Sequence, residues 1–220
     1  MFIGHYAPAV ALKAVSKGPP LWHYFIAVQL LDYLWAIFIL TGVEQARIVP
    51  GFLAASDLDL YNMPYTHSLA AALFWSLAAG AAYRLALNPR AGGGAAIAIA
   101  CAVFSHWLAD LLVHGKDLAL YPGSEQKLGF ALWESIPVSQ TLEFGLLAAG
   151  GLLYIGATRP KGPVGRIAPF VVLAVLAAAQ AFNLVGPPPP GIETPAVLAL
   201  ISYTAFAALA FWLDKTRAPR

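Results

Sequence analysis

The feature that most constrains this chain is a series of apolar stretches, each close to the length of a membrane-spanning helix and separated by Pro and Gly. About 20 apolar residues in a helix cross a hydrocarbon core of about 30 Å. Only 11% of the residues are charged, against about 25% in a typical soluble domain. The stretches also lack the alternating polarity of an outer-membrane barrel strand. We therefore predict an all-α, polytopic membrane helical bundle.

Pro and Gly positions divide the chain into about six candidate transmembrane helices, preceded by a short N-terminal segment. The candidate spans are residues 21–42, 65–87, 95–114, 137–158, 167–185 and 193–213. Residues 1–20 hold an apolar stretch that is too short to span, so we expect an N-terminal half-helix there. We treat 1–220 as a single integral-membrane domain, with the site-bearing spans in 21–158 and two further spans in 159–220.

The basic residues predict the orientation of the bundle. If the first full span leaves the cytoplasm, ten of the 13 Lys and Arg residues lie on the inner side. These are Lys13, Lys17, Arg84, Arg90, Arg159, Lys161, Arg166, Lys215, Arg217 and Arg220, whereas Arg47, Lys116 and Lys127 lie outside. The positive-inside rule then places both termini in the cytoplasm.

The stretch from Ser105 to His114 carries ionisable residues inside the third candidate span. His106, Asp110 and His114 recur every four residues, so on a helix they share one face. An unpaired ionisable group in hydrocarbon costs several kcal/mol, which makes an ionisable residue inside a span a functional-site hypothesis.

Depth along the spans brings further ionisable residues to the level of this face. At 1.5 Å of rise per residue, His106 lies about 18 Å and Asp32 about 16 Å above the inner ends of their spans. His5 also reaches about 18 Å if the half-helix dips inward from its basic end. Glu143 and His67 enter from the outer side and lie about 10 Å and about 4 Å below it. We therefore predict one polar cluster between mid-membrane and the outer face.

Imidazoles and carboxylates together favour a divalent metal, and a single cysteine excludes a thiolate cluster. Nitrogen and oxygen ligands suit zinc, with manganese or iron as alternatives. His106 and Asp110 are spaced to bind one ion, and His67 at the mouth of its span could complete the coordination. Asp57 and Asp59 lie in the preceding outer loop. Their role stays open, and they could be outer metal ligands, hydrogen-bond partners of the ligands or solvated surface charges.

Such a metal would lower the pKa of bound water toward about 7 and supply hydroxide at neutral pH. Glu143 and His114 are then the candidate catalytic residues, with Glu143 as a general base. The alternative for the whole cluster is a set of polar contacts that hold helices together, without a metal.

The ordered set Gly4-His5, Asp32, Pro64-Tyr65-Thr66-His67-Ser68 and Ser105-His106-Trp107-Leu108-Ala109-Asp110 resembles the bacterial inner-membrane proteins described as membrane-bound metal-dependent hydrolases. The order His, Asp, His and His-x-x-x-Asp is also similar to that of the zinc-dependent phospholipase C enzymes, which are soluble and helical. The resemblance covers residues 1–114.

This resemblance implies a bacterial inner-membrane location and five metal ligands, with Asp110 in the position that bridges two metals. The implied ligands are His5, Asp32, His67, His106 and Asp110. The phospholipase pattern continues with a second His and a later His-x-x-x-Glu, for which only His114 and Glu143 could stand in here. One or two metals therefore fit this chain better than three.

The expected function is metal-dependent hydrolysis, by metal-bound hydroxide, of an amphiphilic, lipid-like ester or phosphoester at the outer side of the membrane. The expected partners are membrane lipids, without nucleic acid, and the oligomeric state is open. The main alternative is a proton- or metal-coupled transporter or permease that uses the same cluster. A non-catalytic metal-dependent scaffold is the third possibility.

Overall fold

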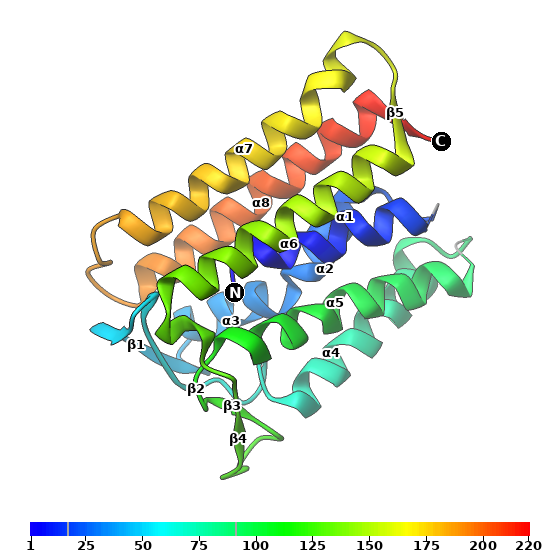
Figure 1. Ribbon diagram of the computed structural model, residues 1–220. Coiled ribbons are helices and arrows are strands. Elements are labelled where there is room, and N and C mark those ends of the chain that lie inside the picture. Colours follow the sequence, from blue (N-terminus) through cyan, green and yellow to red (C-terminus); the bar gives the residue numbers. More distant parts are fainter. Residues whose placement is uncertain (17, 91) are drawn as a thin grey trace.

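The computed structural model describes residues 1–16, 18–90 and 92–220, and Lys17 of the predicted inner side lies outside these residues. The chain is 66% helical and forms a bundle (Figure 1). Its helices are η1 (Ile3–His5), α1 (Tyr6–Val15), α2 (Leu21–Val28), α3 (Leu30–Leu40), α4 (Leu69–Ala82), η2 (Tyr83–Leu87), α5 (Gly93–Val113), η3 (Leu132–Glu134), α6 (Ile136–Ala157), α7 (Pro163–Val185) and α8 (Glu193–Thr216). Short strands pair as β1 (Gln45–Leu53) with β2 (Ser56–Asn62), β3 (Leu118–Ala119) with β4 (Lys127–Leu128), and β5 (Thr158–Pro160) with β6 (Arg217–Pro219).

The helices agree with the predicted segments. Five stretches are long and apolar enough to cross a membrane, namely Leu69–Leu87, Gly93–Val113, Ile136–Ala157, Pro163–Val185 and Glu193–Thr216. The first candidate span is a broken pair, because α2 and α3 are bent by 49° at Gln29. The N-terminal half-helix forms as η1 and α1. The all-α prediction is therefore confirmed, with a break in the first span that the sequence reading did not contain.

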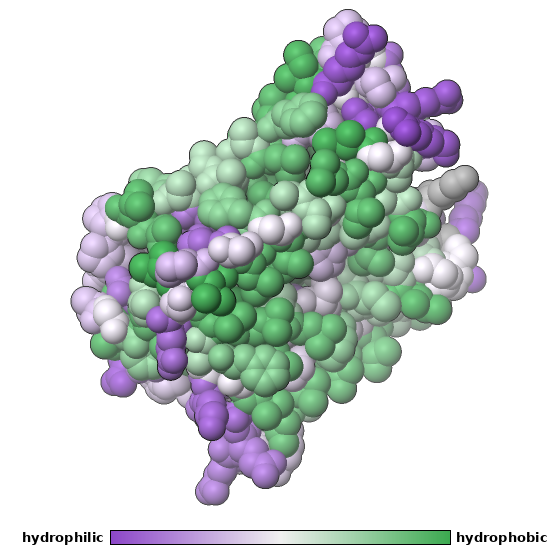
Figure 2. All heavy atoms as spheres, in the orientation of Figure 1, coloured by the Kyte–Doolittle hydropathy of each residue, from purple (hydrophilic) through white to green (hydrophobic). Residues whose placement is uncertain are grey.

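The outer surface of the bundle is consistent with a membrane environment. Large apolar side chains point outward from the candidate spans, including Leu77 at 70% and Leu152 at 71% exposure. Figure 2 shows apolar residues along the flanks of the helices, with hydrophilic residues gathered at the two ends. Soluble monomers rarely expose contiguous apolar surface on this scale, so the surface favours lipid contact.

Small residues allow close helix packing where the site is built. A Cβ on Gly150 of α6 would lie 2.8 Å from Val10 Cγ2 and 2.9 Å from Ala7 Cα, so α1 packs directly on the α6 backbone. A Cβ on Gly80 of α4 would lie 2.9 Å from the carbonyl oxygen of Ala96 in α5. Small residues at helix contacts are typical of membrane bundles, and here they fix α1 and α5 in the bundle.

The two ends of the bundle differ. One end carries the β5–β6 pair, the α4–α5 connection and the C-terminus (Figure 1), and Lys13 lies there, 3.5 Å from Asp214. The residues predicted to face the cytoplasm, Lys17 aside, belong to segments at this end. The other end carries the β1–β2 and β3–β4 hairpins, which the sequence reading treated as outer loops without strands. The β1–β2 hairpin is antiparallel, with Arg47 opposite Asp59.

Candidate metal centre

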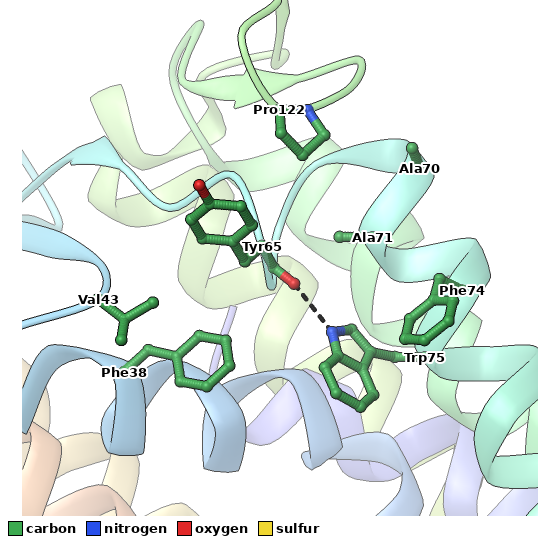
Figure 3. Close-up of a pocket in the computed structure, with 8 residues that line it drawn as sticks. All are labelled: Phe38, Val43, Tyr65, Ala70, Ala71, Phe74, Trp75 and Pro122. Atoms are coloured by element: carbon green, nitrogen blue, oxygen red, sulfur yellow. Dashed lines mark hydrogen bonds between the residues drawn. The ribbon is translucent and has the colours of Figure 1, made fainter. Parts of the chain in front are cut away.

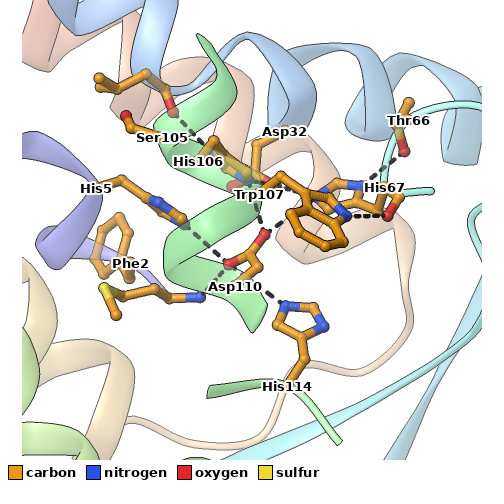
Figure 4. A network of polar contacts seen from close by, with 12 residues as sticks. Phe2, His5, Asp32, Thr66, His67, Ser105, His106, Trp107, Asp110 and His114 are labelled. Carbon is orange, nitrogen blue, oxygen red and sulfur yellow. Dashed lines mark hydrogen bonds and ion pairs between the residues drawn. The ribbon is translucent and has the colours of Figure 1, made fainter. Parts of the chain in front are cut away.

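Helix α5 presents the predicted polar face to the inside of the bundle. His106 is fully buried, and Asp110 keeps only 2% of its surface exposed. Their side chains meet one turn apart, with His106 Nε2 3.0 Å from Asp110 Oδ2. His114 follows directly after the last turn of α5, with Nε2 3.5 Å from Asp110 Oδ1 (Figure 4). The face predicted from the four-residue spacing is therefore present.

The break between α2 and α3 supplies two groups to the same place. The carbonyl of Val28, the last residue of α2, accepts a hydrogen bond of 2.7 Å from His106 Nδ1. One turn further, Asp32 of α3 places Oδ1 3.4 Å from His106 Nε2. Asp32 is 17% exposed, whereas the other cluster side chains are nearly closed off.

The N-terminal segment brings His5 into the cluster, as the depth argument predicted. The His5 ring stacks on the His106 ring at 3.8 Å, and His5 Nε2 lies 3.1 Å from Asp110 Oδ1. The Met1 amine also contacts Asp110 Oδ1, at 2.6 Å. Met1 therefore lies inside the bundle, away from the basic end.

Glu143 holds this N-terminal segment. Its two carboxylate oxygens accept the backbone N–H groups of Phe2 at 2.8 Å and Gly4 at 2.7 Å. These contacts anchor the 3-10 turn that carries His5. They give Glu143 a positioning role, and its predicted role as a general base stays a prediction.

His67 completes the centre from the turn before α4. Its Nε2 lies 3.3 Å from Asp32 Oδ1 and 3.6 Å from Asp110 Oδ2. Trp107 of α5 donates its indole N–H to the His67 carbonyl at 3.0 Å, which ties the turn to α5. The five ligands expected from the resemblance thus converge, although they come from segments far apart in the sequence.

Four of these side chains have the spacing of a shared ion. Asp32 Oδ1, Asp110 Oδ2 and the Nε2 atoms of His67 and His106 are separated by 3.0, 3.3, 3.4 and 3.6 Å in the four nitrogen–oxygen pairs. Two ligands of a tetrahedral ion, each about 2.0–2.1 Å from the metal, lie about 3.4 Å apart. These nitrogen–oxygen separations are compatible with ligands of a shared divalent cation. Two overlapping sets of three, His67/His106/Asp110 and His5/Asp32/His106, meet the spacing for an ion.

The outer ring nitrogens fix which way the imidazoles point. Nδ1 of His67, His106 and His114 contacts Thr66 Oγ1, the Val28 carbonyl and Asp117 Oδ1 at 2.7, 2.7 and 3.0 Å. Metal-binding histidines almost always use their second nitrogen in this way. Nε2 of His67 and His106 then faces both Asp32 and Asp110, and Nε2 of His114 faces Asp110.

Two of the inward nitrogens lack a hydrogen bond despite their short distances to Asp110. His5 Nε2 and His106 Nε2 are buried and have no hydrogen-bond partner among the described residues. Short separation without hydrogen-bond geometry is what two ligands of one cation show. Eight further buried side-chain atoms lack partners among the described residues, so the metal assignment rests on these two nitrogens together with the ligand spacing.

His114 and the loop carboxylates lie at the edge of this centre. His114 lies between two carboxylates, with Nε2 3.5 Å from Asp110 Oδ1 and Nδ1 3.0 Å from Asp117 Oδ1. Asp57 and Asp59 belong to the β1–β2 hairpin, where they contact Gly51 N–H and the Arg47 side chain. Both carboxylates therefore stabilise the β1–β2 hairpin through these contacts.

Two further residues of the site were missed by the sequence analysis. Tyr203 of α8 donates its hydroxyl to Asp32 Oδ2 at 2.8 Å, which brings one of the last two spans to the centre. Glu44 contacts the turn that carries His67. A tyrosine in an apolar span gives no signal of such a contact, whereas Glu44 stands out as an acidic residue directly after a span.

Comparison with known proteins adds no relative: no family model, curated protein or solved structure matches the chain. The resemblance to membrane-bound metal-dependent hydrolases therefore rests on the quoted residues alone.

Proposed function

We propose that this protein is a membrane-embedded metal-dependent hydrolase with a zinc-type centre. The observation that carries the proposal is the convergence of buried His and Asp side chains in two overlapping sets of three, His67/His106/Asp110 and His5/Asp32/His106, each with the spacing for an ion. The orphaned Nε2 of His106 supports the same assignment. Zinc fits this donor set best, with manganese or iron as alternatives.

Some residues of the site would bind the ion directly, and others orient the residues that bind it. A divalent cation at this place would polarise an ester or phosphoryl oxygen and supply a nucleophile from water at neutral pH. The second set of three with the spacing for an ion is His5, Asp32 and His106, so a second ion there would share residues with the first. Glu143 holds the His5 segment, and we retain Glu143 and His114 as the candidate groups for proton transfer.

An apolar groove beside the centre supports an amphiphilic substrate. The groove has a volume of about 570 Å³ and is lined by Phe38, Val43, Tyr65, Ala70, Ala71, Phe74, Trp75 and Pro122 (Figure 3). Tyr65 lies two residues before His67, and its carbonyl accepts the Trp75 indole N–H at 2.8 Å. We propose that a lipid chain occupies this groove while a phosphoester or ester group reaches the metal.

The expected location is the bacterial inner membrane, with the basic end of the bundle in the cytoplasm and the hairpin end outside. The centre would then open toward the outer half of the membrane. The sidedness follows from the positive-inside rule, and cysteine labelling from each side of the membrane tests it.

Metal analysis together with turnover tests the proposal. Purified protein is expected to hold near-stoichiometric zinc or manganese and to hydrolyse a member of a panel of phospholipids and polyprenyl phosphate esters. His106→Gln and Asp32→Asn should lose both properties. His23→Gln is the matched control, because His23 lies outside the centre and contacts the Tyr83 hydroxyl at 3.3 Å. Wild-type protein that binds no divalent metal would overturn the proposal.

One observation favours a transporter as the second candidate. The 49° break between α2 and α3 lies beside the cluster, and broken helices next to ionisable residues are typical of transporter sites. Metal-free protein that moves protons or metal ions across liposomes, in a manner abolished by Asp110→Asn, would favour this function over hydrolysis.

A further inference from the structure

Glu44 is a buried carboxylate outside the metal centre. It keeps 1% of its surface exposed, and it has no ion pair with a described residue. A buried carboxylate without a positive partner is costly unless hydrogen bonds satisfy it. Its environment therefore needs a specific explanation.

The end of α3 places Glu44 where it is. Gly42 has φ of +74°, its N–H bonds to the Ile39 carbonyl, and the Val43 N–H bonds to the Phe38 carbonyl at 2.8 Å. This is a Schellman ending, in which a glycine in the left-handed region closes the helix. The chain reverses there, and Glu44 reaches under the turn that precedes α4.

Three hydrogen bonds join Glu44 to that turn. Its Oε1 accepts the backbone N–H groups of Tyr65 at 2.7 Å and Thr66 at 2.9 Å. Its Oε2 accepts the Thr66 hydroxyl at 2.6 Å. The carboxylate thus fixes both the backbone of the turn and the orientation of one side chain.

The Thr66 hydroxyl passes this orientation to His67. A hydroxyl has one hydrogen, and at Thr66 that hydrogen is donated to Glu44. The Thr66 oxygen, 2.7 Å from His67 Nδ1, must then accept the Nδ1 hydrogen. In a neutral imidazole this leaves the lone pair on Nε2, which faces Asp32 and Asp110.

We propose that Glu44, acting through Thr66, is a positioning residue that sets the tautomer of His67 for metal binding. The inference rests on the proposed metal centre and deepens it. His106 and His114 are oriented by a direct acceptor, the Val28 carbonyl and the Asp117 carboxylate. His67 is oriented instead by a carboxylate–hydroxyl pair, so its metal affinity depends on a residue that does not contact the ion.

The chain offers variants that separate this role from general stability. Glu44→Gln keeps the shape and the acceptor for the backbone, but its amide hydrogens face Thr66, so the hydroxyl hydrogen turns toward His67 Nδ1. Thr66→Val removes the hydroxyl at constant shape, and Thr66→Ser keeps it. Asp57→Asn is the control, because Asp57 also accepts a backbone N–H, from Gly51, in the hairpin.

Two measurements on the full-length protein in detergent test the inference. Zinc affinity, from competition with a chelator, should fall about 10–100-fold in Glu44→Gln and Thr66→Val, the usual effect of losing a partner of a metal-bound histidine. Thr66→Ser and Asp57→Asn should bind as wild type does. Nitrogen NMR of histidine-labelled, metal-free protein, assigned with His67→Gln, should show the Nδ1–H form of His67 in wild type and lose it in Glu44→Gln.

The outcomes distinguish this inference from the proposed function. If wild type binds zinc, and Glu44→Gln keeps both the affinity and the His67 tautomer, the positioning role is wrong and the metal centre stands. If wild type binds no zinc, the metal centre is wrong, and a metal-free His67 tautomer unchanged by Glu44→Gln overturns the positioning role as well.

Discussion

Two buried charged regions lie at opposite ends of this bundle, and they differ in how their polar atoms are satisfied. At the basic end, the Arg217 guanidinium donates to Thr158 Oγ1 at 2.7 Å and to the carbonyls of Thr158, Gly165 and Ile155. At the metal centre, inward-facing nitrogens of His5 and His106 have no hydrogen-bond partner among the described residues.

This difference in hydrogen bonding distinguishes Arg217, whose charge stabilises the fold, from the metal centre, whose charges are placed to bind a ligand. Every nitrogen of the Arg217 guanidinium donates a hydrogen bond, to the Thr158 hydroxyl, to carbonyls at the end of α6, where backbone acceptors lack helical partners, and to a carbonyl at the start of α7. The metal centre instead combines carboxylates with imidazoles, of which His67, His106 and His114 are fixed through Nδ1, whereas Nε2 of His5 and His106 has no hydrogen-bond partner among the described residues. We infer that the first region exists for stability and the second for a ligand, and the following variants test that division.

The largest expected effect is at Asp110. Both of its oxygens face nitrogen atoms of the centre, so Asp110→Asn should weaken zinc binding by more than about 100-fold. Zinc at 1,000 times its Kd stabilises a folded protein by about 4 kcal/mol. Thermal unfolding with zinc and with chelator should therefore show a zinc-dependent rise in Tm for wild type and none for Asp110→Asn. An equal rise in both proteins would remove Asp110 from the centre.

The next effect is at Arg217. Arg217→Met keeps the bulk of the side chain but leaves buried carbonyls without donors, so we expect the free energy of unfolding to fall by about 2–4 kcal/mol. Zinc affinity should stay at the wild-type level, because Arg217 lies at the opposite end of the bundle. A variant with normal stability and weakened zinc binding would reverse the assignment of the two regions.

A third variant tests whether the packing of α1 against α6 affects the metal centre. Gly150→Ala places a methyl group 2.8–2.9 Å from Val10 and Ala7, so α1 must shift away from α6. Overpacking of this kind costs about 1–3 kcal/mol, and the shift should also weaken zinc binding through His5. Gly145→Ala and Gly156→Ala, with nothing near the added methyl, should be neutral or stabilised by up to about 1 kcal/mol. Equal unfolding curves for all three would show that α1 does not need this close approach.

Much of the site could be predicted because it depends on regular geometry. The four-residue spacing places His106 and Asp110 on one face of any helix, and the constant rise per residue places Asp32 at the same level. His5 required one more assumption, that the short N-terminal segment enters the bundle from its basic end. Span positions and relative depths are thus encoded by length and spacing.

The features of the site that the sequence analysis did not predict depend on local backbone irregularity and on contacts between distant segments. The break at Gln29 has no Pro or Gly to announce it, so the Val28 carbonyl could not be assigned to His106. The first candidate span ended at residue 42, but the left-handed conformation of Gly42, which directs Glu44 to Thr66, is visible only in the structure. The β1–β2 hairpin does alternate polar and apolar residues, over 45–48 and 57–60, but the sequence analysis did not use this signal.

The smallest expected effect is at Tyr203, which tests whether α8 belongs to the metal centre or only to the bundle. Tyr203→Phe removes one hydrogen bond of 2.8 Å to Asp32 Oδ2, and a typical bond of this kind contributes about 0.5–1.5 kcal/mol. Zinc affinity should therefore fall about 2–10-fold, with little change in Tm. Tyr33→Phe is the matched control, because its hydroxyl contacts Thr204 of α8 at 3.2 Å on the exposed side. If both variants change zinc affinity equally, α8 acts through helix packing, whereas an effect confined to Tyr203→Phe makes α8 part of the centre.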